Sequence, residues 1–239
     1  MKTTVVLLTW QRIELLRKTL KTLSDQTFKK FDVRITNANL EQSAQVDKIA
    51  SLFNNNLNIT VSHEGNDLKS FRRFTVGNEL ALSGTEAILF IDDDVTFSKH
   101  YVNNLVRAFE PHTYKSGFAW NFQNGGQNYY QQRTRRFDNK ETIHYCGTGM
   151  SIIDSSIFLD NRLLEVPAEA YYIEDLWLSY FAQSVLGWGL KYVDVGPVQL
   201  GGADRHALYR QITRDKRNEN VPDKSDFLRK LVKDYGWVL

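Results

Sequence analysis

An apolar run that ends in three consecutive aspartates constrains the fold of this chain more than any other feature. Residues 87–91 read Ala-Ile-Leu-Phe-Ile, and Asp92, Asp93 and Asp94 follow directly. Such a short, unbroken run is typical of a strand buried on both faces of a parallel sheet, although a buried helix segment has the same composition. Open α/β sheets bind their ligands beyond the carboxyl ends of the strands. The aspartates therefore lie where a ligand site is expected.

The three aspartates indicate a cation site. Side chains alternate along an extended backbone, so we expect Asp92 and Asp94 to face one way and Asp93 the other. Adjacent carboxylates repel one another and Asp is a poor strand former, so a buried strand that ends in three of them is expected to use them. Carboxylate oxygens suit Mg²⁺ or Mn²⁺. The alternative is a solvated acidic turn that caps the next helix.

The first hundred residues alternate between strand and helix patterns. Apolar stretches at residues 3–9, 31–36 and 58–62 are followed by stretches with helical spacing of apolar residues at 13–23, 42–53 and 69–83. Three such alternations before the aspartates predict an α/β fold with a doubly wound, mostly parallel sheet and right-handed crossovers. We expect residues 1–97 to form a Rossmann-like, nucleotide-binding half.

The pattern changes after residue 98. Ser98 is a candidate N-cap for a helix that stops before Pro111. Residues 117–122 look like a strand, and residues 124–128 look like a Gly-rich turn. The stretch 129–137 is polar, aromatic and basic. It contains three arginines, Arg133, Arg135 and Arg136. These arginines can bind phosphate or an anionic acceptor, or they can lie in a solvated loop.

Two glycines, Gly147 and Gly149, stand between apolar flanks in residues 143–153. Glycine lets the backbone approach a ligand closely or bend sharply. A ligand-binding loop and a simple β-bulge both explain these residues.

Residues 171–189 predict a buried helix that opens with two acids, Glu174 and Asp175. Nearly every position from Asp175 to Leu186 is apolar or small. Carboxylates in a first helical turn are favoured by the helix dipole, which is an ordinary structural explanation. Paired acids at the mouth of a buried helix can also supply a positioned base, and this is the interpretation that we favour.

The C-terminal part predicts a short strand at 190–195, a Gly-rich segment that reaches His206, and a last helix at 226–239. His206 could complete a metal shell with the aspartates. A lone histidine is more often a surface residue, so this assignment needs further support.

Composition narrows the class of protein. Hydrophobic residues make up 42% of the 239, enough for a full core, and one domain spanning residues 1–239 is expected. The net charge of +2 argues against nucleic acid as the main partner, since proteins that bind it usually carry a basic excess. The single cysteine excludes an internal disulfide and suits a reducing compartment. Residues 5–8 are too few for a signal peptide or a transmembrane segment, so we expect a cytoplasmic protein, free or peripheral to a membrane.

Taken in order, these motifs resemble those of the GT-A fold glycosyltransferases, most of all family 2. The resemblance covers residues 3–206 and implies a smaller, acceptor-side sheet within residues 98–206 and a helical tail at 207–239. It is carried by Thr9-Trp10-Gln11-Arg12 after the first strand, Ser24-Asp25-Gln26-Thr27 after a Leu-rich helix, the Asp-x-Asp motif in Phe90-Ile91-Asp92-Asp93-Asp94, the loop Gly147-Thr148-Gly149, the Glu-Asp motif in Ile173-Glu174-Asp175, and His206.

The resemblance implies a metal-dependent donor site. Asp94 and His206 would hold Mn²⁺ or Mg²⁺ against the diphosphate of a nucleotide sugar, and Asp92 would lie near the ribose or share the metal. Such a cation neutralises charge on the leaving nucleoside diphosphate. UDP is the expected nucleotide. Contacts to the nucleotide would come from Thr9, Arg12, Asn37, Asn39, Arg72, Arg73, Asp92 and Asp93.

Two segments depart from the family pattern. Asn37-Ala38-Asn39 stands where the family often has an Asp after its second strand. Ser70-Phe71-Arg72-Arg73-Phe74 fits an Ala-Arg-Asn-like segment only loosely.

The resemblance also implies a catalytic base. Asp175 would take a proton from the acceptor hydroxyl as it attacks the anomeric carbon, in a single displacement that inverts the anomeric configuration. Glu174 would hold the acceptor or support the loop. The remaining acceptor contacts would come from Gly147, Thr148, Gly149 and Trp177.

The leading hypothesis is therefore an inverting glycosyltransferase that moves one sugar from a nucleotide-diphosphate sugar to a carbohydrate, lipid-linked or protein-linked glycan. One alternative is a sugar-phosphate nucleotidyltransferase, but residues 9–12 lack the glycines of its N-terminal loop. Another is a GT-A domain without activity that binds carbohydrate or a partner.

Overall fold

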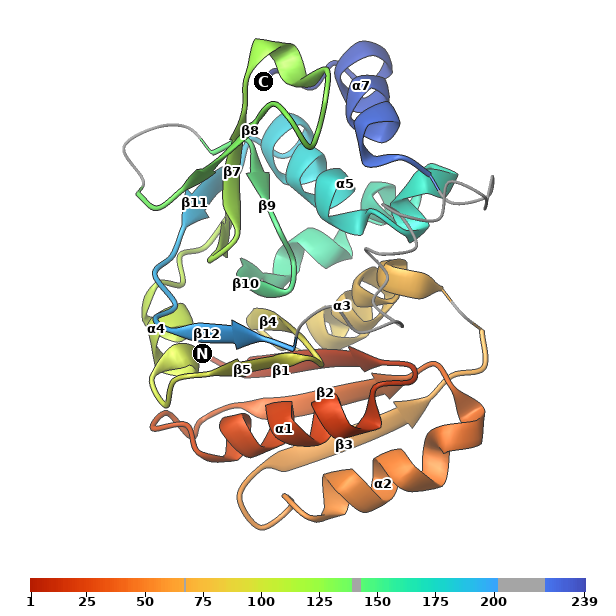
Figure 1. Cartoon of the computed structure of the whole chain (residues 1–239), viewed down its shortest axis with the longest axis vertical. Helices are drawn as coiled ribbons and strands as arrows, with labels where there is room; N and C mark the ends of the chain where they lie inside the picture. Colours follow the sequence, from red (N-terminus) through yellow and green to blue (C-terminus); the bar gives the residue numbers. More distant parts are fainter. Residues whose placement is uncertain (67, 139–142, 202–221) are drawn as a thin grey trace.

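The chain is built around a seven-stranded β-sheet (Figure 1). The computed structural model describes residues 1–66, 68–138, 143–201 and 222–239. The strands of the sheet lie in the order β11-β6-β10-β4-β1-β2-β3. In chain order they are β1 (Thr3–Thr9), β2 (Asp32–Asn37), β3 (Asn58–His63), β4 (Ala87–Asp92), β6 (Thr113–Ser116), β10 (Met150–Asp154) and β11 (Gly189–Tyr192).

Most strands of this sheet are parallel. β1 pairs in parallel with β2 and β4, and β2 pairs in parallel with β3. β10 runs antiparallel to both β4 and β6, whereas β11 is parallel to β6. The predicted α/β fold with a mostly parallel sheet is confirmed. Because β1, β2 and β4 are parallel, their carboxyl ends meet at one edge, where ligands of such sheets bind.

The apolar run before the aspartates is a central strand that is covered on both faces. In β4, Ile88 and Phe90 pack into one core, and Ala87, Leu89 and Ile91 pack into another on the opposite face. All five side chains are almost completely buried. A strand with two covered faces needs apolar residues at every position, which is why the run is continuous.

Helices cover both faces of the main sheet. The core on one face includes side chains of α1, α2 and α4, and the core on the other includes side chains of α3, α5 and α7. No helix in the described ranges is long and apolar enough to cross a membrane. The helices are α1 (Ile13–Ser24), α2 (Ser43–Ser51), α3 (Arg72–Leu82), α4 (Tyr101–Arg107), α5 (Glu174–Tyr180) and α7 (Lys224–Asp234).

Several predicted helices differ in extent from those observed. The helix expected over residues 171–189 begins at Glu174, and a π-helical segment, Phe181–Val185, follows α5. The helix expected over residues 69–83 opens with a 3₁₀ turn, Lys69–Phe71, before α3. The last helix begins at Lys224, where the side chain of Asp223 accepts hydrogen bonds from the amides of Ser225 and Asp226. An N-cap of this kind fixes a helix start that apolar spacing alone does not reveal.

Two smaller sheets complete the fold. The antiparallel sheet β8-β7-β9 lies at one end of the molecule beside α5 and α7 (Figure 1). It is the small sheet expected within residues 98–206. The other pairs β5 with β12 just after the aspartates. Their strands are β5 (Val95–Phe97), β7 (Ala119–Phe122), β8 (Arg133–Arg136), β9 (Tyr145–Cys146) and β12 (Val198–Leu200).

The basic stretch at residues 133–136 is an edge strand and not a solvated loop. β8 pairs with β7 so that Arg135 lies opposite Trp120. The guanidinium of Arg133 lies 4.4 Å from the centre of the Trp120 ring, and that of Arg135 lies 4.9 Å from the centre of the Phe118 ring. Stacking on aromatic rings lets arginine side chains pack while they keep their charge, so a basic sequence is compatible with this strand.

Candidate active site

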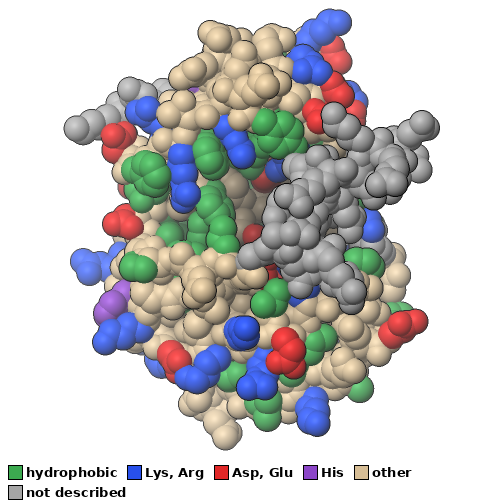
Figure 2. Space-filling view, viewed as in Figure 1, with side chains coloured by type: hydrophobic (Ala, Val, Ile, Leu, Met, Phe, Trp, Pro, Cys, Tyr) green, Lys and Arg blue, Asp and Glu red, His purple; other side chains and the backbone are tan. Residues whose placement is uncertain are grey.

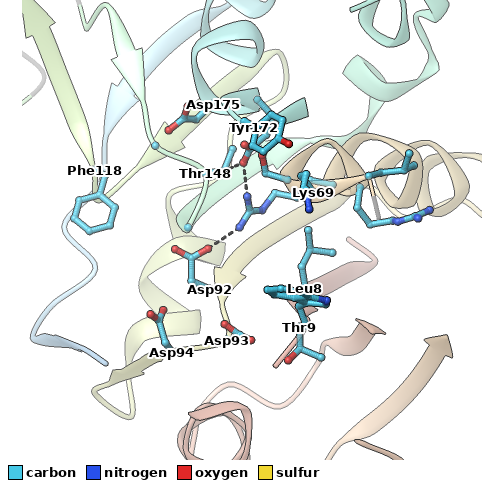
Figure 3. A pocket seen from close by; sticks show the side chains of 18 of the residues that line it. Leu8, Thr9, Lys69, Asp92, Asp93, Asp94, Phe118, Thr148, Tyr172 and Asp175 are labelled. Carbon is cyan, nitrogen blue, oxygen red and sulfur yellow. Dashed lines mark hydrogen bonds and ion pairs between the residues drawn. The ribbon is translucent and has the colours of Figure 1, made fainter. Parts of the chain in front are cut away.

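A cavity of about 420 Å³ lies between the carboxyl ends of β1 and β4 and the small sheet. Its lining includes Thr9 and the three aspartates on one side, and Phe118, Thr148 and Asp175 on the other (Figure 3). On the face shown in Figure 2 the surface is hollowed, with hydrophobic and basic side chains at the rim and acidic side chains within. A cavity of this size suits a small-molecule substrate.

The acidic motif is a turn between two strands. β4 ends at Asp92 and β5 begins at Val95. The side chain of Asp92 is 37% exposed and that of Asp94 is 16% exposed, whereas that of Asp93 is only 1% exposed. Figure 3 shows Asp93 turned toward Thr9, away from Asp92. The motif therefore presents two carboxylates to the cavity and buries the third, although all three border it.

Arg12 neutralises the inner part of the acidic turn. Its guanidinium forms an ion pair with Asp93, and its Nη1 lies 2.6 Å from Oδ2 of Asp94. Burial raises the pKa of Asp93 to about 7, although Arg12 opposes the rise. Burial also raises the pKa of Asp94, and the charge of Asp92 adds to that effect. A cation beside Asp92 and Asp94 would lower the electrostatic cost of keeping both ionised.

Arg73 connects the two sides of the cavity. Its Nη2 lies 2.6 Å from Oδ1 of Asp92, and its Nη1 pairs with Oε1 of Glu174 at the start of α5 (Figure 3). The hydroxyl of Thr148 donates a 2.7 Å hydrogen bond to the same Glu174 oxygen. Glu174 is buried at the cavity wall, and its contact with Thr148 joins it to the Gly-rich loop.

The Gly-rich loop approaches the acidic turn so closely that a side chain at one of its positions would meet a carboxylate of the turn. A Cβ at Gly149 would collide with the carboxylate of Asp92. The carbonyl of Gly149 accepts a 3.1 Å hydrogen bond from the backbone amide of Asp92. A larger residue at this position would displace the Asp92 carboxylate from its place beside Arg73, and the loop continues into the cavity wall through Gly147 and Thr148.

Asp175 lies at the start of α5 with both carboxylate oxygens engaged. Oδ2 accepts a hydrogen bond from the hydroxyl of Tyr145 and lies 3.3 Å from Nζ of Lys224. Oδ1 accepts a 2.9 Å hydrogen bond from the amide of Leu176. Burial by itself would lower the pKa of Lys224. The negative charge of Asp175 has the opposite effect, and the pKa of Lys224 lies above its usual value. The carboxylate is thus held in one orientation at the cavity wall.

Most residues expected in a site meet at this cavity. They include the acidic turn, the Gly-rich loop, the two acids of α5, and Thr9, Arg12, Arg72 and Arg73.

Three of the expected residues do not line the cavity, and a fourth lies outside the described residues. Asn37 is buried and donates to the carbonyl of Asn39, whose side chain in turn caps a 3₁₀ turn. The Trp177 indole donates to the carbonyl of Leu163 within the core. These contacts satisfy polar groups inside the fold, which is why such residues are poor markers of a site. His206 lies outside the described residues.

Three other cavity residues were not assigned to the site from the sequence: Lys69, Tyr145 and Lys224. Lys224 reaches the cavity from the C-terminal helix, far in sequence from Asp175. Lys69 lies 5.8 Å from the centre of the Trp10 ring and 5.9 Å from that of Tyr172. Tyr145 stands two positions before Gly147, so its place next to the Gly-rich loop is a signal that could have indicated it.

The carboxylates fit a Mn²⁺ or Mg²⁺ site that substrate oxygens complete. Within the described ranges, no three His, Cys, Asp or Glu side chains are grouped so that they could hold a metal by themselves. Asp92 and Asp94 supply two carboxylates that border the cavity. Mg²⁺ is commonly held by one or two carboxylates together with substrate phosphates, so this donor set suits a cation that arrives with a nucleotide.

Residues 4–163 match the sequence profile of glycosyl transferase family 2. The chain belongs to this family. A search of curated proteins found no match.

Solved structures of glycosyltransferases share the GT-A fold of this chain. TarS of S. aureus, residues 1–349 in complex with UDP, is 20% identical with a TM-score of 0.57, over 80% of this chain and 57% of that one. The same fragment in complex with UDP-GlcNAc is 19% identical with a TM-score of 0.56, over 80% of this chain and 56% of that fragment. GalNAc-T7 with UDP, GalNAc and Mn²⁺ is 13% identical with a TM-score of 0.61, over 99% of this chain and 54% of that one. This family member thus spans little more than half the length of each.

Replacing Arg73 with Met should destabilise the protein because it removes the ion-pair partner of the buried Glu174 carboxylate. Loss of one member of a buried pair costs roughly 3–5 kcal/mol, and adding Glu174→Gln should recover most of it. Urea unfolding of the single and double variants measures both effects.

Lys230→Met is the control, since Lys230 pairs with Glu169 near the surface and its loss should cost at most about 1 kcal/mol. A double variant as unstable as Arg73→Met would contradict the importance of this pair.

Proposed function

We propose that this protein is a metal-dependent, inverting glycosyltransferase that moves one sugar from a nucleotide-diphosphate sugar, a UDP-sugar by preference, to an acceptor hydroxyl. One observation carries the proposal. A single cavity contains both the Asp92–Asp94 turn and the oriented carboxylate of Asp175. Membership of glycosyl transferase family 2 supports it, as do the UDP, UDP-GlcNAc and Mn²⁺ bound in the structures of similar fold.

The donor would bind against the carboxyl edge of the main sheet. We assign this role to residues 1–97, with Asp92 and Asp94, and His206 by family resemblance, as the residues that hold Mn²⁺ or Mg²⁺. The cation supplies Lewis-acid stabilisation of the departing nucleoside diphosphate. Arg12 and Arg73 add positive charge on either side of the two carboxylates, where guanidinium groups can also donate to phosphate oxygens.

The acceptor would bind on the side of the small sheet and α5. We assign this role to residues 98–206, and we treat residues 207–239 as a helical tail of the same domain. Asp175 accepts the proton of the attacking hydroxyl, and Tyr145 and Lys224 hold its Oδ2 so that the carboxylate keeps one orientation. A base fixed on the face opposite the leaving group favours a single displacement with inversion.

Replacing Asp94 with Ala should abolish the metal dependence of nucleotide binding, because it removes a carboxylate proposed to hold the cation. UDP affinity with Mn²⁺ and with EDTA, measured by filter binding of labelled nucleotide, should become equal in this variant. Asp25→Ala is the control, since Asp25 is exposed and pairs with Lys21 on α1. A variant that still binds UDP more tightly with Mn²⁺ would remove Asp94 from the metal site.

Replacing Asp175 with Asn should keep nucleotide binding and lower sugar transfer by a factor of at least ~10², the lower end for loss of a positioned base. The assay is release of UDP from a panel of UDP-sugars in the presence of saccharide acceptors. Asp226→Asn, an exposed position on α7, should behave as wild type. Near-normal turnover by Asp175→Asn would mean that another group is the base.

A further inference from the structure

Within the part of the chain that the structure describes, the side-chain contacts of one guanidinium at the cavity are to aromatic rings. Arg133 on β8 borders the cavity, and its guanidinium carbon lies 4.4 Å from the ring centres of both Trp120 and Tyr129. The ring of Tyr130 is 6.0 Å away. Aromatic contacts of this kind attract a cation without neutralising it.

Several other cavity cations are paired with carboxylates. Arg12 pairs with Asp93 and Asp94, and Arg73 pairs with Asp92 and Glu174. Lys224 pairs with Asp175. Within the described residues, no carboxylate lies within ion-pair distance of Arg133. The positive charge of Arg133 is therefore available to a ligand in the cavity.

Arg133 lies on the side of the candidate base. Tyr129 has the Arg133 guanidinium at 4.4 Å and the Lys224 ammonium at 5.0 Å from its ring centre. The Tyr129 hydroxyl donates to the Tyr145 hydroxyl over 3.2 Å, and the Tyr145 hydroxyl donates to Asp175. Tyr129 and Tyr145 thus connect Arg133 to the candidate base on the side of the small sheet, which the proposed function assigns to the acceptor.

The neighbouring arginines of β8 have other surroundings. Arg135 is exposed and donates to the carbonyl of Gly117 over 3.1 Å. Arg136 lies 3.7 Å from Asp138. Neither borders the cavity. The strand therefore commits one of its three arginines to this space.

We propose that Arg133 binds an anionic group, a phosphate or a carboxylate, carried by the acceptor. The planar guanidinium matches both oxyanions with two parallel N–H donors, and rings stacked against it fix its plane before the ligand arrives. This inference rests on the proposed function, because it takes the β8 side of the cavity to be the acceptor side. It specifies an acidic saccharide or a sugar phosphate as the acceptor class.

The test compares matched pairs of acceptor fragments. Tryptophan fluorescence of the whole protein, with UDP and Mn²⁺ present, would follow titration with glucose 6-phosphate against glucose and with methyl glucuronide against methyl glucoside. One anionic member should bind at least about ten-fold more tightly than its neutral partner, as expected for hydrogen bonds to a charged group. The pair that shows the preference distinguishes phosphate from carboxylate.

Arg133→Gln should reduce the anionic preference to less than about two-fold while the neutral member binds as before, since only the charged contact is lost. The preference is a ratio within one sample, so partial unfolding does not create or remove it. Arg133→Lys is the second variant and should also lose most of the preference, because an ammonium cannot make the paired contact. Arg136→Gln removes the same charge from the same strand and should keep the preference.

Three results would overturn the inference: no anionic preference in the wild type, a preference that survives in both Arg133 variants, or an equal loss in Arg136→Gln. A separate UDP titration distinguishes this failure from failure of the proposed function. If the protein binds UDP but does not prefer the anionic fragments, only the inference about Arg133 is wrong. If the protein prefers the anionic fragments but binds no nucleotide, the anion site is supported and the transferase proposal is contradicted.

Discussion

The buried guanidinium of Arg73 is the interaction on which the geometry of the cavity depends. It contacts Asp92 at the end of β4 and Glu174 at the start of α5, two residues from opposite sides of the cavity. Burial alone would lower the pKa of Arg73, but Glu174 and Asp92 outweigh it, and the pKa lies above its usual value. A buried charge is tolerated only where such partners surround it. The two sides are therefore linked through one side chain.

The Gly-rich loop depends on the same link. Thr148 donates to Glu174, and Gly149 lies so close to Asp92 that a side chain there would displace the carboxylate. The pairing of β10 with β4 sets this approach, because Met150 lies opposite Ile91 in the antiparallel register. The carboxylates that border the cavity are thus positioned by a strand on one side and by a loop on the other. Such support from two elements is what a site needs to hold its groups in one geometry.

Much of the fold could be predicted from local sequence because its central strands are covered on both faces. The run at residues 87–91 is apolar throughout for that reason, and the acids that follow it reach the sheet edge. Asp92 and Asp94 are more exposed than Asp93, as alternation predicted, although residues 93 and 94 form a turn and not the extended backbone on which that prediction was based. The resemblance to family 2 was carried by ordered motifs, and among the described residues Asp92–Asp94 lie at a strand end and Glu174 and Asp175 at a helix start.

The rest depends on contacts between distant segments. Asn37 follows the second strand, as a nucleotide contact would, but its amide is used by Asn39 and His63. The sequence around Lys224 does not distinguish it from the other lysines of a polar tail. Because of the way α7 packs, however, the ammonium of Lys224 reaches Asp175. The β8 arginines looked like a solvated loop because sequence alone does not reveal the rings of Trp120 and Tyr129 beside them. Local patterns give the elements, and tertiary packing decides which side chains meet.

The most direct test of the account is calorimetric titration of the wild-type protein with UDP, GDP and dTDP, each with Mn²⁺ and then with EDTA. We expect UDP to bind most tightly and EDTA to weaken its binding, because the carboxylates of the Asp92–Asp94 turn need a cation to hold a diphosphate. Absence of binding by all three nucleotides in the presence of Mn²⁺, or binding that EDTA does not change, would contradict it.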